Sequence, residues 1–259
     1  MGVGTVWFIG AGPGDPELIT VKGRRLIAAA DLVLYAGSLV PREVLACARG
    51  EARVVDSAPL SLAETHALLR DCALAGGLCA RVHTGEPALY GAVQEQAALL
   101  DAEGIPWAVV PGVSSVFATA AAARVSCTVP GGTQSLVVTR LSGRTPVPES
   151  ENLAALAAHG AALAVLLSAS EPERVQAELL AGGYPPETPV VIGHRVGWPG
   201  GETLRTVLGD LAATARAAGC TRQTVFLVLP GAGSSGRSKL YDPAFSHGWR
   251  AGSDPAGDA

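Results

Sequence analysis

The stretch "FIGAGPGDPELITVKG", residues 8–23, places a glycine-rich turn between an apolar strand and a helical segment. A strand, turn and helix of this kind opens the dinucleotide-binding domain, whose turn reads G-x-G-x-x-G. Here the glycines are Gly10, Gly12 and Gly14, so the third comes one residue early. Pro13 also removes a backbone donor that a pyrophosphate could use. The turn therefore favours the close approach of another ligand, with a plain structural turn and a dinucleotide site as the alternatives.

Outward from this stretch, apolar strands alternate with helices through the first half of the chain. The segment "SLAE" (61–64) is a capping-box signature that opens one of these helices. The strands are apolar throughout, without a polar face, which favours a mostly parallel sheet covered by helices on both sides. The strands are expected at residues 5–10, 31–36, 52–57, 78–85 and 106–112.

After an alanine-rich helix near 113–124 the pattern restarts. We therefore expect an α/β protein with two α/β domains, mostly parallel sheets and an active-site cleft between the domains. The domains are expected at 1–115 and 116–250, followed by a disordered tail at 251–259. Further strands are expected at 135–141, 162–169, 189–196 and 223–229, with helices near 151–159, 171–182 and 209–218.

The composition indicates a compact protein. Of the 259 residues, 48% are hydrophobic and 16% are charged, which excludes a disordered chain. The net charge of −4 argues against broad nucleic-acid binding, which needs a basic face. No apolar run is long enough to cross a membrane and the start does not read as a signal peptide, so we expect a cytoplasmic protein. The five cysteines are scattered, and we expect free thiols in a reducing compartment.

Four turns marked by glycine or proline follow predicted strands. Ligands of open parallel sheets bind at the carboxyl edge of the strands, so four turns gathered there indicate a binding site. No metal-ligand spacing, nucleophile elbow or phosphate-binding P-loop is present, so we expect no metal site, hydrolase or nucleoside triphosphatase. The turns are "GAGPGD" (10–15), "HTGEPALYG" (83–91), "PGVSS" (111–115) and "HRVGWPGG" (194–201).

Taken together and in order, the turns resemble the tetrapyrrole methylase family. The resemblance implies S-adenosylmethionine as the methyl donor, S-adenosylhomocysteine as its product, a tetrapyrrole (precorrin) substrate and a homodimer. "YAGSLVP" (35–41) and "SGRTPVPE" (142–149) are most similar to the branch that methylates carbon 11 of precorrin-4, or of its cobalt form, in cobalamin biosynthesis. The matching segments are "VWFIGAGPGDPELITVKGRRLI" (6–27), "LYAGSLVP" (34–41), "RVHTGEPALYGAVQEQ" (81–96), "VVPGVSS" (109–115) and "LYDPAFSHGWR" (240–250).

The resemblance also implies which residues bind the cofactor. One of them, Glu86, departs from the family, which usually has Asp there. No acid or base is assigned, because Ala36 stands where relatives acting on uroporphyrinogen carry an acidic residue; Asp56, Ser38 and Tyr90 are candidates. The implied cofactor residues are Pro13, Thr84, Gly85, Glu86, Leu89, Ser114, Ser115, Leu167 and Val196.

A precorrin carries several carboxylates, which call for cations. The candidates are Arg140, Arg144, His83 and Arg195. Three other interpretations stay open at this point: methylation of another precorrin position, a nicotinamide-dependent oxidoreductase, and a binding module without catalysis.

Overall fold

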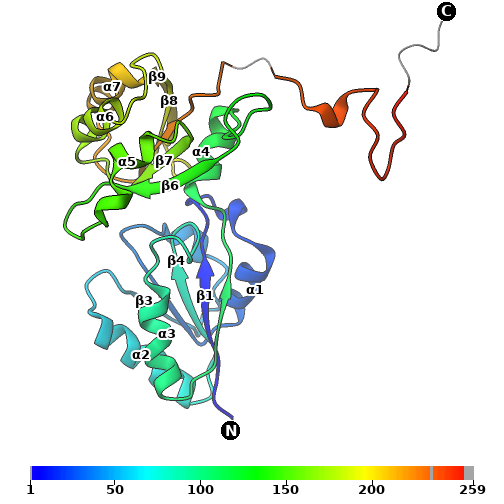
Figure 1. The fold of residues 1–259 in the computed structure, drawn as a ribbon. Helices are drawn as coiled ribbons and strands as arrows, with labels where there is room; N and C mark the ends of the chain where they lie inside the picture. Colours follow the sequence, from blue (N-terminus) through cyan, green and yellow to red (C-terminus); the bar gives the residue numbers. More distant parts are fainter. Residues whose placement is uncertain (1, 234–235, 254–259) are drawn as a thin grey trace, which may run out of the picture. The chain divides into compact units, whose positions relative to one another are not determined.

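The computed structural model describes residues 2–233 and 236–253 (Figure 1). The tail predicted to be disordered, 251–259, therefore lies outside the described residues from position 254 onward. Across the described part of the chain, no helix is both long and apolar enough to span a bilayer.

The chain divides into two compact units. One comprises the chain up to Ala118 together with Arg195–Glu202, and the other comprises Thr119–His194 and the chain from Thr203 onward. The predicted division at 115/116 did not anticipate that Arg195–Glu202 would join the first unit. The chain thus passes between the units at three positions.

The first unit contains a five-stranded sheet in which every strand pair is parallel. Its order is β3-β2-β4-β1-β5. The inner strands β1, β2 and β4 are almost fully buried, whereas the edge strand β3 is mostly exposed. The two central neighbours, β1 and β4, pair from Val6 with Cys79 to Gly10 with His83. The strands are β1 Val6–Gly10, β2 Leu32–Tyr35, β3 Arg53–Asp56, β4 Cys79–His83 and β5 Trp107–Val110.

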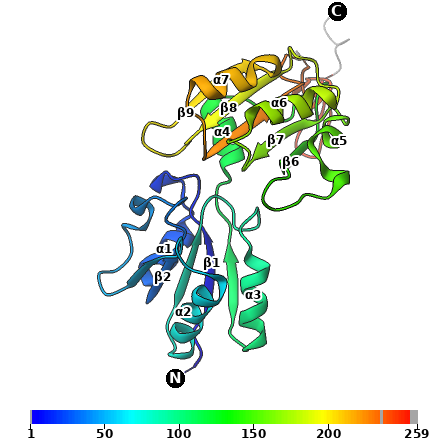
Figure 2. The same ribbon diagram turned by 90° about the vertical axis from the view of Figure 1, so that its left-hand side faces the viewer.

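Helices cover both faces of this sheet (Figure 2). Leu26 and Ile27 of α1 pack on one face, whereas Leu69 of α2 and Leu100 of α3 pack on the other. The neighbouring strands β1 and β4 are thus followed by helices on opposite faces, which makes their carboxyl ends a topological switch point. The helices of this part of the chain are η1 Pro16–Leu18, α1 Val21–Ala29, η2 Arg42–Leu45, α2 Leu62–Leu74 and α3 Val93–Ala102. The next helix, α4 Ser115–Ala123, begins in the first unit and continues into the second.

The segment after the first turn differs from its prediction. The helical segment expected after the turn does not begin as one helix, because Asp15 caps only the short 3₁₀ helix η1. Ile19 is extended, and Thr20 caps α1 by accepting a hydrogen bond from Gly23 N at 3.1 Å. A second capping residue therefore starts a new helix where one continuous helix was predicted.

The second unit contains a mixed sheet, so the prediction of mostly parallel strands is wrong for this half. β6 and β7 pair in parallel, whereas β10 is antiparallel to both β7 and β8. The cause is the edge strand β9, which was not predicted. It lies between β8 and α7 in the chain, so the chain runs along the sheet once more before it enters β10. For this reason β10 runs opposite to β8. The order is β6-β7-β10-β8-β9, with β6 Leu136–Arg140, β7 Ala162–Leu166, β8 Pro189–His194, β9 Glu202–Val207 and β10 Thr224–Val228.

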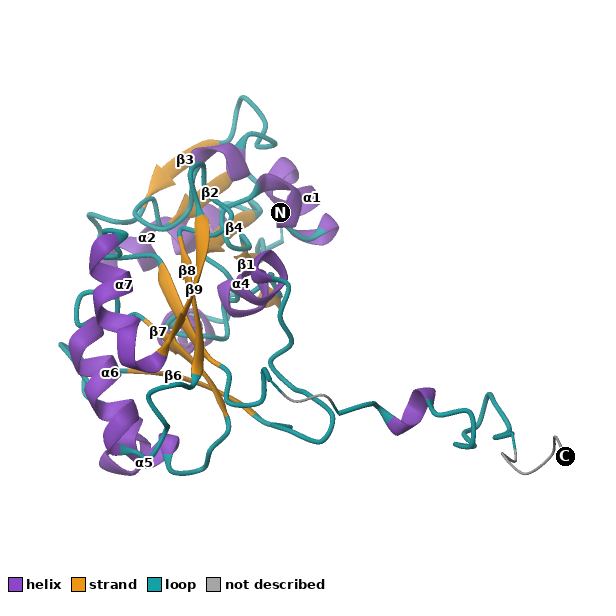
Figure 3. Ribbon diagram, turned by 90° about the horizontal axis from the view of Figure 1, so that it is seen from above, coloured by secondary structure: helices purple, strands orange, loops and turns teal. Residues whose placement is uncertain are grey.

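Three helices lie along one face of the second sheet (Figure 3). Leu153, Val175 and Leu211 of these helices pack on Ile192 and Phe226 of the sheet in one core. On the other face α4 packs so closely that a Cβ at Gly193 would collide with Thr119. The helices of this unit are η3 Glu149–Glu151, α5 Leu153–Ala157, α6 Pro172–Ala181, η4 Leu208–Asp210, α7 Leu211–Ala217 and η5 Lys239–Tyr241.

Candidate cofactor and substrate site

Three glycine turns of the first unit meet at the carboxyl edge of its sheet. Gly12 and Gly85 form an antiparallel bridge, in which Gly85 N donates to Gly12 O at 2.8 Å and Gly12 N donates to Gly85 O at 3.3 Å. The Glu86 carboxylate accepts a hydrogen bond from Gly112 N at 2.9 Å. The turns that follow β1, β4 and β5 therefore form one connected surface.

Packing inside the protein explains the glycines of the first turn. A Cβ at Gly10 would lie 2.5 Å from the backbone of Gly112, and a Cβ at Gly14 would lie 2.6 Å from the Trp198 indole. Gly12 has φ +76, a conformation that glycine adopts without strain. The early third glycine thus faces a tryptophan of the same unit, whereas the dinucleotide fingerprint needs its third glycine for helix–strand packing.

The fourth turn, Arg195–Glu202, packs on the first one. A Cβ at Gly197 would lie 3.0 Å from Pro13 Cγ, so the two turns are in tight contact. The guanidinium of Arg195 lies 5.8 Å from the Trp198 ring centroid, within the range of a cation–π interaction. The prediction that four turns gather at one edge is therefore confirmed within the first unit. Trp198 was missed by the sequence analysis, although it interrupts the glycines of "GWPGG".

The Glu86 carboxylate joins two backbone segments by hydrogen bonds. One of its oxygens accepts from Gly112 N at 2.9 Å, and the other accepts from Ala88 N at 3.0 Å. Both bonds fix the turn that also carries Thr84 and Leu89. The Glu86 carboxylate therefore links its own turn to the turn that follows β5.

Next to these hydrogen bonds, polar groups remain that the protein does not satisfy. Thr84 and Ser115 are half-buried, and neither hydroxyl has a hydrogen-bond partner among residues 2–233 and 236–253. A Cβ at Gly85 would meet nothing closer than Ser115 N at 3.8 Å, so there is room beside this residue. Free hydroxyls next to open backbone fit a small polar ligand.

The other cofactor candidates of the first unit lie in the same four turns. Ser114 directly precedes α4, and its Oγ accepts a hydrogen bond from Val116 N at 3.3 Å, which caps the helix. Pro13 is buried, whereas Leu89 and Val196 are half-buried. The ligand-binding roles of these residues stay predictions.

At the edge of the second sheet, two candidates come from the carboxyl ends of the neighbouring strands β6 and β7. Arg140 ends β6 and is paired with Leu166, the last residue of β7. The residue after Leu166, Leu167, has φ +53 and is 66% exposed. A leucine in the left-handed region of backbone conformation is strained, and such strain occurs preferentially at functional sites. Leu167 as a cofactor contact stays a prediction.

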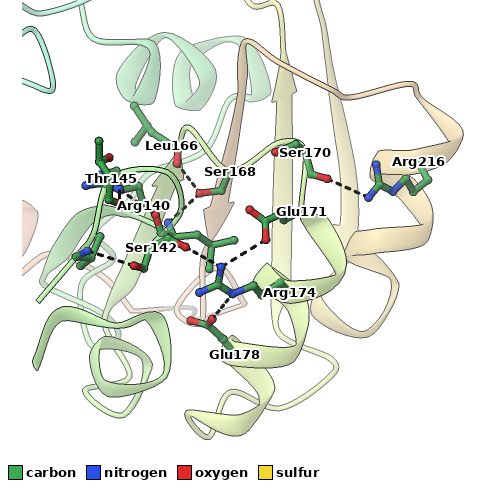
Figure 4. Close-up of polar contacts among 12 residues, drawn as sticks. Arg140, Ser142, Thr145, Leu166, Ser168, Ser170, Glu171, Arg174, Glu178 and Arg216 are labelled. Atoms are coloured by element: carbon green, nitrogen blue, oxygen red, sulfur yellow. Dashed lines mark hydrogen bonds and ion pairs between the residues drawn. The ribbon is translucent and has the colours of Figure 1, made fainter. Parts of the chain in front are cut away.

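Two of the predicted substrate cations, Arg140 and Arg144, differ in their surroundings, and Figure 4 shows those of Arg140. The Arg140 guanidinium donates hydrogen bonds to three backbone oxygens, those of Leu141 at 3.1 Å, Thr145 at 3.0 Å and Pro146 at 2.9 Å. Arg144, by contrast, is exposed. Arg140 is therefore engaged in shaping the loop, which was not expected of a substrate ligand.

His83 does not provide the positive charge expected of it. The residue is 6% exposed, and its ring centroid lies 5.9 Å from that of Phe8. Burial, and next the nearby Arg81 charge, lower the pKa of His83 to about 3, so the imidazole is neutral at physiological pH. Its Nε2 is buried and has no partner among the residues that the structure describes.

Arg81 is a second residue that the sequence analysis missed. It is buried beside His83 and donates to Gln96 Oε1 at 2.9 Å, to Ser57 Oγ at 2.9 Å and to Leu34 O at 3.4 Å. Burial lowers the pKa of Arg81 to about 10. The only available signal was an arginine inside the apolar strand "CARVH", because a charge at that position must be buried.

The three acid–base candidates lie in turns. Asp56 Oδ1 accepts from Gly37 N at 2.8 Å and from Ala58 N at 2.8 Å, so its carboxylate holds the loop after β2. Ser38 is exposed in that loop, and Tyr90 is 46% exposed with φ +58. Their catalytic roles stay predictions. The five cysteines are free thiols, and no set of three or more His, Cys, Asp or Glu side chains in the described chain could hold a metal ion.

The fold and the strand-end turns together define a class of protein. It is an α/β protein of two sheets, whose glycine-rich turns lie at a topological switch point of the parallel sheet. Residues 5–212 match the family model described as tetrapyrrole (corrin/porphyrin) methylases.

Named relatives extend this match to nearly the whole chain. The cobalt-precorrin-4 C(11)-methyltransferase of Priestia megaterium is 44% identical, over 95% of this chain and 98% of that protein. The precorrin-4 C(11)-methyltransferase of Pseudomonas aeruginosa is 42% identical, over 96% and 99%. The chain belongs to the tetrapyrrole methylase family.

Solved structures agree with this assignment. A cobalt precorrin-4 methyltransferase, described as a cobalamin biosynthetic enzyme, has a TM-score of 0.84 and 44% identity, covering 86% of this chain and 94% of that one. The uroporphyrin-III C-methyl transferase from Thermus thermophilus, solved in complex with S-adenyl homocysteine, has a TM-score of 0.71 and 28% identity, covering 87% and 97%.

Proposed function

We propose that this protein transfers a methyl group from S-adenosylmethionine to carbon 11 of precorrin-4, or of its cobalt form, in cobalamin biosynthesis. The observation that carries the proposal is the joined surface of the turns after β1, β4 and β5, in a chain 42–44% identical to enzymes named for this reaction. The relatives include both the cobalt and the metal-free forms of the name, so both substrates are kept.

The cofactor would be held by turns that the protein has already ordered. Glu86 fixes the turn carrying Thr84 and Leu89, and the Thr84 and Ser115 hydroxyls are available to a polar ligand beside Gly85. S-adenosylmethionine supplies a methyl group activated by its own sulfonium, so the chain needs no nucleophile. The proposed cofactor residues are Pro13, Thr84, Gly85, Glu86, Leu89, Ser114, Ser115, Leu167 and Val196.

The substrate carboxylates require cations on the surface of the protein. Arg144 and Arg195 are exposed and suit this role, whereas Arg140 is engaged with its own loop. His83, being neutral, could contribute a hydrogen bond but no charge. A homodimer and a cytoplasmic location are further predictions.

The proposal is tested by cofactor binding first. Isothermal titration with S-adenosylhomocysteine should give a dissociation constant in the micromolar class, and NAD should give no heat of binding. Incubation with precorrin-4 and methyl-labelled S-adenosylmethionine should then transfer the label. Binding of NAD alone would favour an oxidoreductase, and binding without transfer would favour a non-catalytic module; either result contradicts the proposal.

A further inference from the structure

The loop after β6, residues 141–148, has a conformation fixed from inside. The Arg140 side chain donates to the carbonyl oxygens of Leu141, Thr145 and Pro146 at 2.9–3.1 Å, which closes the loop around the guanidinium. Within the loop, Val147 N donates to Ser142 Oγ at 3.3 Å. We call residues 141–148 the Arg144 loop, after the residue near its tip.

A second set of contacts joins the base of the Arg144 loop to helix α6. Arg174 donates to Ser142 O at 2.6 Å, while its charge is balanced by Glu171 at 3.4 Å and Glu178 at 2.8 Å (Figure 4). Because two glutamates neutralise Arg174, its contact with the loop is a structural one.

The same base is also tied to the end of β7. The buried hydroxyl of Ser168 accepts from Leu141 N at 2.9 Å and donates to Leu166 O at 2.7 Å (Figure 4). The Arg144 loop is therefore held at the carboxyl ends of two neighbouring parallel strands, which is the edge where ligands bind.

At the tip of this ordered loop, Arg144 is exposed. Gly143 N donates to Thr145 O at 3.2 Å, so the two residues that flank Arg144 are joined to each other. The Arg144 guanidinium has no hydrogen bond or ion pair with any residue that the structure describes. A fork of five donors on a preordered loop matches a carboxylate, and the preordering lowers the entropic cost of binding.

We propose that Arg144 binds a carboxylate of the tetrapyrrole substrate, and that Arg140 and Arg174 are positioning residues that hold the Arg144 loop for this contact. The proposal rests on the proposed function, because it takes the anionic substrate from there. It separates the predicted cations by role: Arg144 touches the substrate, whereas Arg140 acts only through the loop.

The test is steady-state methyl transfer to precorrin-4 by the full-length chain. Arg144→Ala should raise KM for precorrin-4 about tenfold, the loss expected for one charge-assisted hydrogen bond, with kcat and the affinity for S-adenosylhomocysteine unchanged. It should also weaken the dependence of kcat/KM on salt, because one charge pair is gone. Arg144→Lys should restore part of both. Arg25→Ala, at an exposed arginine of α1, is the matched control and should behave as wild type.

The positioning role is tested by Arg140→Ala and Arg174→Ala. Each should raise KM with kcat and the affinity for S-adenosylhomocysteine unchanged, and the Arg140→Ala/Arg144→Ala double variant should be no worse than Arg144→Ala alone. If Arg140→Ala does not fold, Arg174→Ala carries the same comparison. An active wild type with unchanged KM and salt dependence in Arg144→Ala would overturn this inference and leave the proposed function intact. A wild type that transfers no methyl group would overturn both.

Discussion

Charged side chains at the strand ends mostly bond to the backbone of their own turns. Glu86 accepts from two backbone amides, Asp56 accepts from two others, and Arg140 donates to three carbonyls. Such bonds fix loop conformations, and the hydroxyls of Thr84 and Ser115 keep no partner among the residues that the structure describes. A charged residue at a strand end is therefore better evidence for an ordered turn than for a contact with substrate.

Leu167 allows a test of strain at one residue. Its φ of +53 costs a bulky residue about 1 kcal/mol or more, so Leu167→Gly should raise the free energy of unfolding by about 0.5–1 kcal/mol. The same change removes an exposed apolar side chain and should weaken S-adenosylhomocysteine binding, as measured by titration calorimetry. Gln223→Gly is the control, since Gln223 has φ +52: it should gain stability without losing affinity. Equal affinity in the Leu167 variant would remove Leu167 from the site.

His83 makes stability depend on pH. Its pKa of about 3 lies below the ordinary 6.5, so between these two pH values His83 binds a proton in the unfolded chain but not in the folded one. The neutral His83 does not lower the free energy of unfolding above pH 6.5. Below that pH, His83 should lower it by about 1.4 kcal/mol per pH unit as the pH drops toward 3. Urea unfolding of His83→Gln between pH 7 and 4.5 should show a shallower loss than wild type. His159→Gln, at an exposed histidine, should keep the wild-type slope; the same slope in His83→Gln would contradict this account.

At the scale of elements, the turns at the carboxyl ends of the strands contact one another directly, in addition to the pairing of the strands. The turn after β1 touches the turns after β4 and β5 and the Arg195–Glu202 segment, with glycines at the closest approaches. The presence of each turn could be predicted from glycine and proline. Which turn meets which could not, because the partner of Gly14 is Trp198, far away in the sequence.

The contact of Gly14 with Trp198 predicts unequal costs for two similar substitutions. Gly14→Ala should lower the free energy of unfolding by about 2–4 kcal/mol, because φ is +135 and the new Cβ would lie 2.6 Å from the indole. Gly85→Ala should cost only about 1–2 kcal/mol, since its φ of +59 is the sole obstacle and space is open beside it. Urea denaturation measures both. Equal losses would show that Trp198 does not define the conformation of the turn.

At the scale of the whole molecule, the first sheet follows from its sequence and the second does so only in part. Continuous apolar strands alternating with helices predict the parallel sheet of the first unit. In the second unit, "TVFLV" of β10 is equally apolar in either direction, so the sequence pattern does not reveal that the strand is antiparallel. The missed strand β9 is half-exposed and polar, "ETLRTV", which a search for buried strands passes over.

The candidate site divides in the same way. Pro13, Glu86 and Ser114 could be placed from their turns and from the family resemblance, and the first unit brings these turns together. The neutral state of His83 and the loop-closing role of Arg140 depend on burial and on backbone oxygens that no local pattern encodes.

The central claim is methyl transfer to carbon 11 of precorrin-4, and product analysis tests it most directly. Reaction with S-adenosylmethionine carrying a ¹³C-labelled methyl group should add one methyl to the substrate by mass spectrometry, and carbon NMR should place the label on carbon 11. Running metal-free and cobalt-loaded substrate in parallel identifies the preferred form. An unchanged substrate mass with both forms, or a label on any other ring carbon, would contradict the account.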